Sequence, residues 1–139
     1  IVPYKAICKM DMRLVPNQDP DEIFDLVEKH VKKHLPEAEV IKHGKMYPSR
    51  TDLTLPVSKT IVAAVAKAWG TDPVVVPLSG ASCPEYVFTK ILEIPTVSVP
   101  YANPDESNHG PNENFDLDLF IKGIKTTAYV LDAIARDNK

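Results

Sequence analysis

The sequence predicts an α/β protein, in which amphipathic helices and short strands alternate along the chain and pack in layers. Three segments carry apolar residues at helical spacing, namely residues 20–35, 57–69 and 116–135. Two short apolar runs, residues 74–76 and 96–99, are typical of strands buried in a parallel sheet. Residues 4–15 alternate between apolar and polar side chains, which is the pattern of a strand with one solvated face.

The composition is that of an ordinary globular protein and limits the class of partner. The 139 residues are 44% apolar and 25% charged, with a net charge of -3. Neither nucleic acid nor a membrane surface is indicated as a partner. We find no bilayer-spanning apolar segment and no signal peptide, so we expect a cytoplasmic protein. Cys8 and Cys83 lie in unrelated contexts and are expected to be free thiols.

The first 47 residues predict a strand–helix–strand unit. In the first strand the residues expected on the buried side are Ala6, Cys8, Met10, Met12 and Leu14. Asp19 is the expected N-cap of the helix at 20–35, and Pro20 is its expected first residue. Pro36 ends this helix, and residues 39–47 are expected to form the second strand.

Residues 48–56 form a polar connector, which is the expected domain boundary. The helix at 57–69 has Ser58 as a candidate N-cap and Gly70 at its end. Its expected buried face contains Ile61, Val65 and the alanines.

The apolar strand at 74–76 is followed by a predicted helix at 85–92 and a second buried strand at 96–99. The final helix, 116–135, is expected to direct inward Leu119, Phe120, Ile124, Thr127, Leu131 and Ile134.

The loop at residues 107–114 (SNHGPNEN) contains one histidine among glycine, proline and asparagine residues. Asp105 and Glu106 precede this loop, and a helix follows it. Such a loop can present the neutral imidazole of His109 rigidly toward a cleft, as a metal ligand requires. A solvated surface histidine is the alternative interpretation.

Residues 80–84 (GASCP) lie between a predicted strand and a helix, where open α/β sheets bind ligands. Small residues there let the backbone approach a substrate, and a helix N-terminus favours an anion or a carbonyl oxygen. A tight structural turn is the alternative. Cys83 is also a candidate nucleophile, although a small buried side chain is the commoner use of cysteine.

Two further features have a simple and a functional interpretation. His30 and His34 lie one helical turn apart, but the lysines that flank them oppose a cation, so a solvated face is expected. Arg13 projects from the polar side of the first strand. It is either an exposed charge or a fork that binds a substrate carboxylate through two hydrogen bonds.

Three stretches, residues 12–20, 80–84 and 109–113, together resemble a family of dizinc peptidases and deacylases. This family includes carnosinase, succinyl-diaminopimelate desuccinylase, acetylornithine deacetylase, aminoacylase and glutamate carboxypeptidase. The resemblance implies that residues 51–139 are the C-terminal part of a layered α/β catalytic domain. Residues 1–50 would then be the strand–helix–strand half of an α+β, ferredoxin-like lid domain that mediates dimerisation.

The resemblance also implies roles for single residues. His109 matches the histidine that binds one zinc ion, and Arg13 matches the lid arginine that contacts the substrate carboxylate. The resemblance further implies that the backbone of Gly80, Ala81 and Ser82 contacts the substrate. It also implies that Asn112 and Glu113 hold the metal-binding histidine ring in position. Ala81 and Cys83 depart from the family's Gly-Gly-Ser-Ile-Pro pattern, which puts the backbone contacts in doubt.

The implied reaction is hydrolysis of a peptide bond or an N-acyl amino acid amide bond by metal-activated water. Two zinc ions, with cobalt or manganese as alternatives, polarise the carbonyl and lower the pKa of water, while a carboxylate moves the proton. The family's other ligands and its general base are absent from this sequence. We therefore expect a fragment that is inactive alone, and a zinc site that this chain does not complete.

The implied partners are the missing N-terminal part of the enzyme, a second copy through the lid, and a small peptide or acyl-amino-acid substrate. Unpaired strand edges also predict that the fragment associates. A non-enzymatic oligomerisation module is the alternative function, and it needs no zinc. A cysteine-based enzyme is a third possibility and predicts that Cys83 reacts readily with an alkylating agent.

Overall fold

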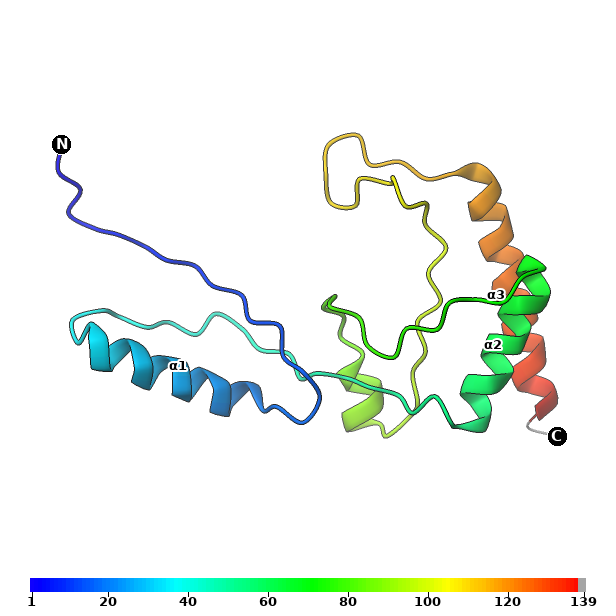
Figure 1. The fold of residues 1–139 in the computed structure, drawn as a ribbon, viewed down its shortest axis with the longest axis horizontal. Helices are drawn as coiled ribbons and strands as arrows, with labels where there is room; N and C mark the ends of the chain where they lie inside the picture. Colours follow the sequence, from blue (N-terminus) through cyan, green and yellow to red (C-terminus); the bar gives the residue numbers. More distant parts are fainter. Residues whose placement is uncertain (138–139) are drawn as a thin grey trace. The chain divides into compact units, whose positions relative to one another are not determined.

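The computed structural model describes residues 1–137, so the last two residues of the predicted domain 51–139 lie outside the described part. Its helical elements are α1 (Pro20–His34), α2 (Pro56–Trp69), the π-helix η1 (Val87–Ile91) and α3 (Leu117–Asp137) (Figure 1). The chain divides into two compact units. Unit 1 comprises Ile1–Arg50 and Leu78–Ile94, and unit 2 comprises Thr51–Pro77 and the segment from Pro95 onward.

Helix α1 begins as the sequence predicts. The carboxylate of Asp19 accepts hydrogen bonds from the backbone N–H groups of Asp21 (2.8 Å) and Glu22 (3.4 Å). Pro20 occupies the first turn, where its missing N–H costs no hydrogen bond. The acidic first turn and basic last turn complement the helix dipole.

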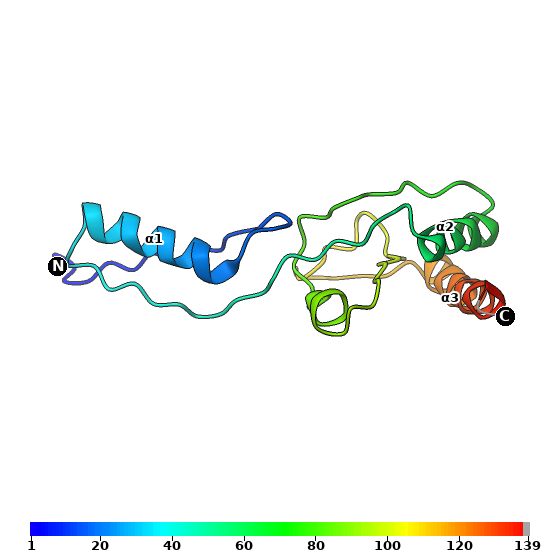
Figure 2. The same cartoon turned by 90° about the horizontal axis from the view of Figure 1, so that it is seen from below.

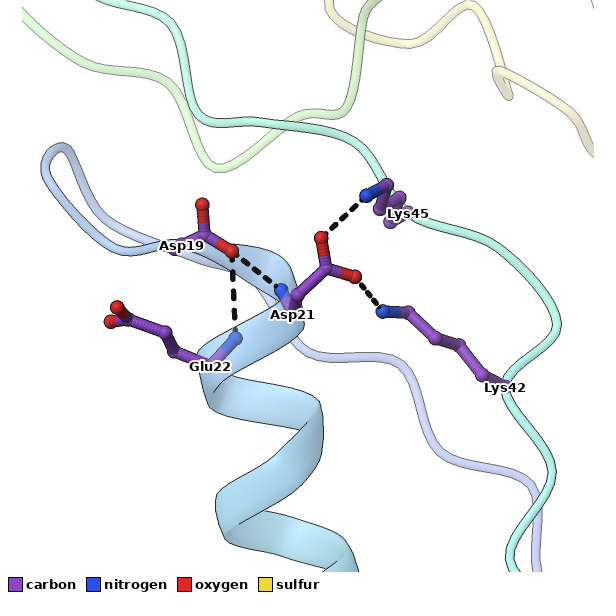
Figure 3. Close-up of polar contacts among 5 residues, drawn as sticks. All are labelled: Asp19, Asp21, Glu22, Lys42 and Lys45. Carbon is purple, nitrogen blue, oxygen red and sulfur yellow. Dashed lines mark hydrogen bonds and ion pairs between the residues drawn. The ribbon is translucent and has the colours of Figure 1, made fainter.

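The segment after α1 is attached to the start of that helix by charge. Asp21 accepts hydrogen bonds from the ammonium groups of Lys42 and Lys45, as Figure 3 shows. These two hydrogen bonds, Lys42 first, lower the pKa of Asp21 below its ordinary value of 3.8. Lys42 also lies over the ring of Phe24, with Nζ 5.0 Å from the ring centroid. These contacts hold the 39–47 segment along one side of α1.

Aromatic and hydroxyl contacts join η1 to the same segment within unit 1. The Nζ of Lys90 lies 3.6 Å from the centroid of the Tyr47 ring, and Tyr47 packs on Tyr86 at 5.8 Å. The hydroxyls of Ser49 and Thr89 are 2.8 Å apart, within hydrogen-bond distance.

Helices α2 and α3 lie side by side in unit 2 (Figures 1 and 2). The Nε1 of Trp69 donates a 2.9 Å hydrogen bond to the hydroxyl of Thr126, which is fully buried. That hydroxyl in turn donates to the carbonyl of Lys122 at 2.8 Å. The apolar core of the described residues consists of Ile61, Ala64 and Val65 on α2. The expected burial of Ile61 and Val65 is therefore confirmed, but of the alanines only Ala64 is buried, and Ala63 is exposed.

Two predictions for these helices were wrong in detail. Ser58 is not the N-cap of α2, because Leu55 holds that position; Ser58 is buried and donates to the carbonyl of Asp52 at 3.0 Å. On α3 the expected inward residues Phe120, Ile124, Thr127 and Leu131 are exposed, whereas Leu119 and Ile134 are half-buried.

The small-residue stripe of α3 explains this difference. Gly123 and Thr126 are its buried residues, and they face inward in place of the more apolar stripe. A Cβ on Gly123 would meet the ring of Tyr101 at 2.8 Å, so only glycine accommodates that ring without a shift. Hydropathy identifies the more apolar face, whereas the Tyr101 ring and the Trp69 side chain pack against the small residues.

The predicted strands at 4–15, 39–47, 74–76 and 96–99 do not form within residues 1–137. A strand requires a neighbouring chain segment to complete its ladder of hydrogen bonds, and apolar alternation does not specify that neighbour. Met10 is 63% exposed and Val74 is 92% exposed, so the expected burial of these segments is also not observed. Helices are therefore observed as the α/β prediction requires, whereas its strands are not observed within residues 1–137.

A side chain serves as the ladder partner at one place in unit 2. The hydroxyl of Thr51 accepts a hydrogen bond from the N–H of Thr96 at 3.0 Å and donates to its carbonyl at 2.6 Å. Both backbone groups of Thr96 are thereby satisfied without a paired strand.

No helix within the described range is long and apolar enough to cross a bilayer.

Candidate functional site

Arg13 and Ser82 lie together in unit 1. The Nη1 of Arg13 donates a 2.5 Å hydrogen bond to the Oγ of Ser82, across 69 positions of sequence. The Nε of Arg13 pairs with the carboxylate of Asp11 at 3.2 Å. More than half of the guanidinium side chain remains exposed, which leaves donors for a further anionic group.

The segment at 80–84 is exposed, including Gly80, Ala81, Ser82 and Cys83. The exposure of Cys83 contradicts the small buried side chain that the sequence favoured, and both cysteines are free. The helix predicted at 85–92 is the five-residue π-helix η1, preceded by a turn in which the N–H of Val87 donates to the carbonyl of Pro84 (3.1 Å). The extended α-helix terminus expected to favour an anion is therefore not formed.

The histidine loop of unit 2 has an unusual backbone. His109 is exposed and has a φ of 60°, and Ser107 and Asn112 are also left-handed, at 56° and 58°. A tight turn brings the N–H of Gly110 to 2.7 Å from the carbonyl of Ser107. A Cβ on Gly110 would lie 2.9 Å from that oxygen, so the turn requires glycine.

Asn103 lies at the base of this loop and is 8% exposed. Its Nδ2 donates to the carboxylate of Asp105 at 2.7 Å and to the Oδ1 of Asn114 at 3.0 Å. Its Oδ1 accepts from the N–H of Asp116 at 2.9 Å. The hydrogen bond from Asn103, followed by one from the backbone of Asp105 itself, lowers the pKa of Asp105 below 3.8.

Asn114 and Asp116 complete the closure of the loop. The N–H of Asn114 donates to the carbonyl of Glu106 at 2.9 Å, and its Nδ2 donates to the carbonyl of Asp105 at 3.2 Å. Asp116 caps α3 by accepting from the N–H groups of Asp118 (2.8 Å) and Leu119 (3.0 Å). The start and end of the loop are thus tied to the first turn of a helix.

Asn103 and Asn114 were not predicted from the sequence as residues of the site. Asn103 precedes a proline, and asparagine often forms local hydrogen bonds in turns, which was the available signal. Nothing in the linear pattern indicates that Asn103 is buried or contacts a residue eleven positions away. The side chains of Asn112 and Glu113 are exposed, and their supporting role stays a prediction.

The described residues supply one candidate metal ligand and not a complete metal site. Residues 1–137 contain no group of three or more histidine, cysteine, aspartate or glutamate side chains placed to hold a metal ion. His30 and His34 are exposed with ring centroids 4.7 Å apart, consistent with the solvated face expected for them. His109 remains the candidate donor, because it is an exposed imidazole on a fixed loop.

Known proteins similar to this chain are metallopeptidases. The Cys-Gly metallodipeptidases of Schizosaccharomyces pombe and Saccharomyces cerevisiae are 28% and 25% identical, over 90% and 94% of this chain. The crystal structure of the M20 family metallo-carboxypeptidase Sso-CP2 from Sulfolobus solfataricus matches 85% of the chain, with a TM-score of 0.78 and 36% identity. The chain spans about 28% of the length of each of these proteins.

The match to the structure of a peptidase supports the predicted α/β class in general terms, without the strands or the lid arrangement. Residues 5–133 match the profile of peptidase family M20/M25/M40, and this match covers nearly the whole chain. The family resemblance found in the three short motifs is confirmed. The chain belongs to peptidase family M20/M25/M40.

Proposed function

We propose that this chain is part of a zinc-dependent amidohydrolase that cleaves a peptide or N-acyl amino acid and binds the substrate's carboxylate. The hydrogen bond from Arg13 to Ser82 carries this proposal. It joins two of the three motifs on which the family resemblance rests, and both motifs are assigned to substrate by that resemblance. A guanidinium with exposed donors suits a carboxylate, which it can bind through two parallel hydrogen bonds.

His109 is the residue of this chain that we propose as a zinc ligand. A bound zinc ion supplies polarisation of the amide carbonyl and a water of lowered pKa. One imidazole is not enough, since a catalytic zinc ion takes three protein ligands. The remaining ligands and the general base would come from residues beyond this chain, and the chain alone is expected to be inactive.

The test uses the protein expressed from its complete reading frame, loaded with zinc. Substrates should include the dipeptide Cys-Gly, because two of the relatives are named Cys-Gly metallodipeptidases. A longer peptide and an N-acetyl amino acid complete the set. Each is offered with a free and with an amidated C-terminal carboxylate. Zinc-dependent release of the amine from the free acids alone is expected. Absence of hydrolysis for all free acids, with zinc bound, would overturn the proposal.

The second candidate is an oligomerisation module, with a second copy of the chain as partner. The observation that favours it is the exposure of apolar side chains on the predicted buried side of residues 4–15, including Met10 and Met12. An extended segment with an uncovered apolar side, which forms no strand within residues 1–137, can pair with another copy. Sedimentation across a range of concentrations tests this, and a monomer at high concentration would exclude it. Zinc content separates the candidates, because a module of this kind needs none.

A further inference from the structure

Asn103 lies at the base of the loop that carries His109, where it is buried and its amide makes three hydrogen bonds. We infer that Asn103 is a positioning residue, which holds the loop of residues 104–115 in the conformation that presents the His109 imidazole. This inference rests on the proposed function, because it assigns Asn103 a purpose only if His109 binds metal. The juxtaposition that carries it is a buried amide bonded to both ends of the loop.

The amide of Asn103 uses its hydrogen-bonding groups on three different parts of the loop. Its Nδ2 donates to Asp105 near the start of the loop, at 2.7 Å, and to Asn114 near its end, at 3.0 Å. Its Oδ1 contacts the N–H of Asp116, at 2.9 Å, where α3 begins. No other natural side chain of this size combines two N–H donors with one acceptor.

The backbone between these anchors needs such support. Ser107, His109 and Asn112 adopt left-handed conformations, which are unfavourable for residues other than glycine. Conformations of this kind persist only where surrounding contacts determine them. Within the described part of unit 2, the contacts that close the loop pass through Asn103, Asn114 and the carbonyl of Glu106.

Asn103 does not contact His109 and would act through the backbone. Loss of its amide should leave the imidazole present but free to sample several orientations. Residues that orient a metal ligand typically account for about 10- to 100-fold in metal affinity. The expected phenotype is therefore weaker zinc binding with an otherwise folded protein.

The decisive variant is Asn103→Asp, made in the protein expressed from its complete reading frame. It keeps the size of the side chain and the acceptor for Asp116, but it removes both donors and places a carboxylate against Asp105. The double variant Asn103→Asp/Asp105→Asn restores one donor–acceptor pair with the charge conserved. Asn108→Asp adds the same charge at an exposed position in the loop and is the matched control.

Zinc affinity is measured by competition with a chromophoric chelator, and cobalt(II) spectra report the ligand geometry. For Asn103→Asp we expect about 10- to 100-fold weaker zinc binding and an altered cobalt spectrum, with partial recovery in the double variant. Asn108→Asp should stay within about twofold of the unmodified protein. Unchanged zinc affinity and cobalt spectrum in Asn103→Asp would overturn the inference.

His109→Ala separates this inference from the proposed function. If His109→Ala loses zinc affinity and Asn103→Asp does not, only the role of Asn103 fails. If His109→Ala binds zinc normally, the proposed ligand itself is wrong and the inference falls with it. Hydrogen exchange of the Asn114 and Asp116 amides, measured without metal, reports independently whether the loop has opened.

Should Asn103→Asp fail to fold, Asn114→Leu supplies the test from the other side of the hydrogen bond. It keeps about the same side-chain volume and removes the Oδ1 that accepts from Asn103, together with the donors to the carbonyls of Asp105 and Asn112. A folded Asn114→Leu protein with unchanged zinc affinity and cobalt spectrum would equally overturn the inference.

Discussion

Arg13 and Ser82, 69 residues apart in sequence, share a 2.5 Å hydrogen bond from guanidinium Nη1 to hydroxyl Oγ. Each residue comes from a motif that the family resemblance assigns to substrate. The guanidinium contacts the Ser82 hydroxyl through Nη1 and the Asp11 carboxylate through Nε. Under the proposed function, its exposed donors would bind the substrate carboxylate beside Ser82.

Replacing Arg13 by lysine should weaken recognition of a carboxylate. Lysine keeps the charge but cannot form two parallel hydrogen bonds from a planar fork. We expect kcat/KM to fall about 10- to 100-fold for substrates with a free carboxylate, mainly through KM. Amidated substrates should be cleaved equally slowly by both proteins. Lys9→Ala, which removes an exposed cation of the same segment, is the control, and an equal loss there would contradict the assignment.

Thr126→Val should destabilise unit 2. The substitution preserves shape but leaves the Nε1 of Trp69 without its partner at a part-buried position. The expected loss in free energy of unfolding is about 1 to 3 kcal/mol, measured by urea denaturation. Thr127→Val is the matched control on the next residue. Its hydroxyl donates to the Gly123 carbonyl at 3.0 Å and lies 3.1 Å from the Tyr101 hydroxyl, but at this exposed residue water can take its place. Equal effects of the two substitutions would show that burial of the Trp69 bond is unimportant.

Gly123→Ala tests whether close packing outweighs helix propensity. Alanine favours a helix over glycine by about 1 kcal/mol. The new Cβ would meet the Tyr101 ring at 2.8 Å, and overpacking of this kind costs about 1 to 3 kcal/mol. We therefore expect a lower midpoint of thermal unfolding. In a Tyr101→Ala background the same change should become stabilising, and an additive double-mutant cycle would refute the steric account.

The ion pairs of Asp21 should make unit 1 sensitive to acid. Because Lys42 and Lys45 lower the pKa of Asp21, its contribution to stability is present above 3.8 and is lost as pH falls through the lower folded-state pKa. Asp21→Asn should remove that part of the acid dependence and reduce stability near neutral pH. Asp25→Asn, at an exposed site on the same helix, is the control. High salt should reduce the difference between the two variants, because all three side chains are partly open to solvent, at 30 to 49% exposure.

The same charges predict the opposite behaviour in alkali. The hydrogen bond from Lys45 to Asp21 raises the pKa of Lys45 above 10.5. Its contribution is therefore complete below 10.5 and is lost as pH rises through the higher folded-state value. Lys45→Gln should abolish this alkaline component in pH-dependent unfolding measurements. A component that survives the substitution would have to come from another group.

The positions of the three α-helices, and some of their ends, followed from the sequence alone. Asp19 and Pro20 begin α1, and Gly70 ends α2 in the left-handed conformation, because these signals act over one helical turn. The family was also identifiable from three short motifs, as the match to the family profile confirms. The role of His109 as a metal ligand stays a prediction.

Which surfaces meet became clear only from the folded chain. The sequence favoured the most apolar stripe of α3, but the buried residues are Gly123, against the ring of Tyr101, and Thr126, bonded to Trp69 of α2. The predicted strands depended on neighbours that a local pattern does not contain. Asn103 shows the same limit at the candidate site, because its importance lies in contacts with Asn114 and Asp116 that exist only once the loop has closed.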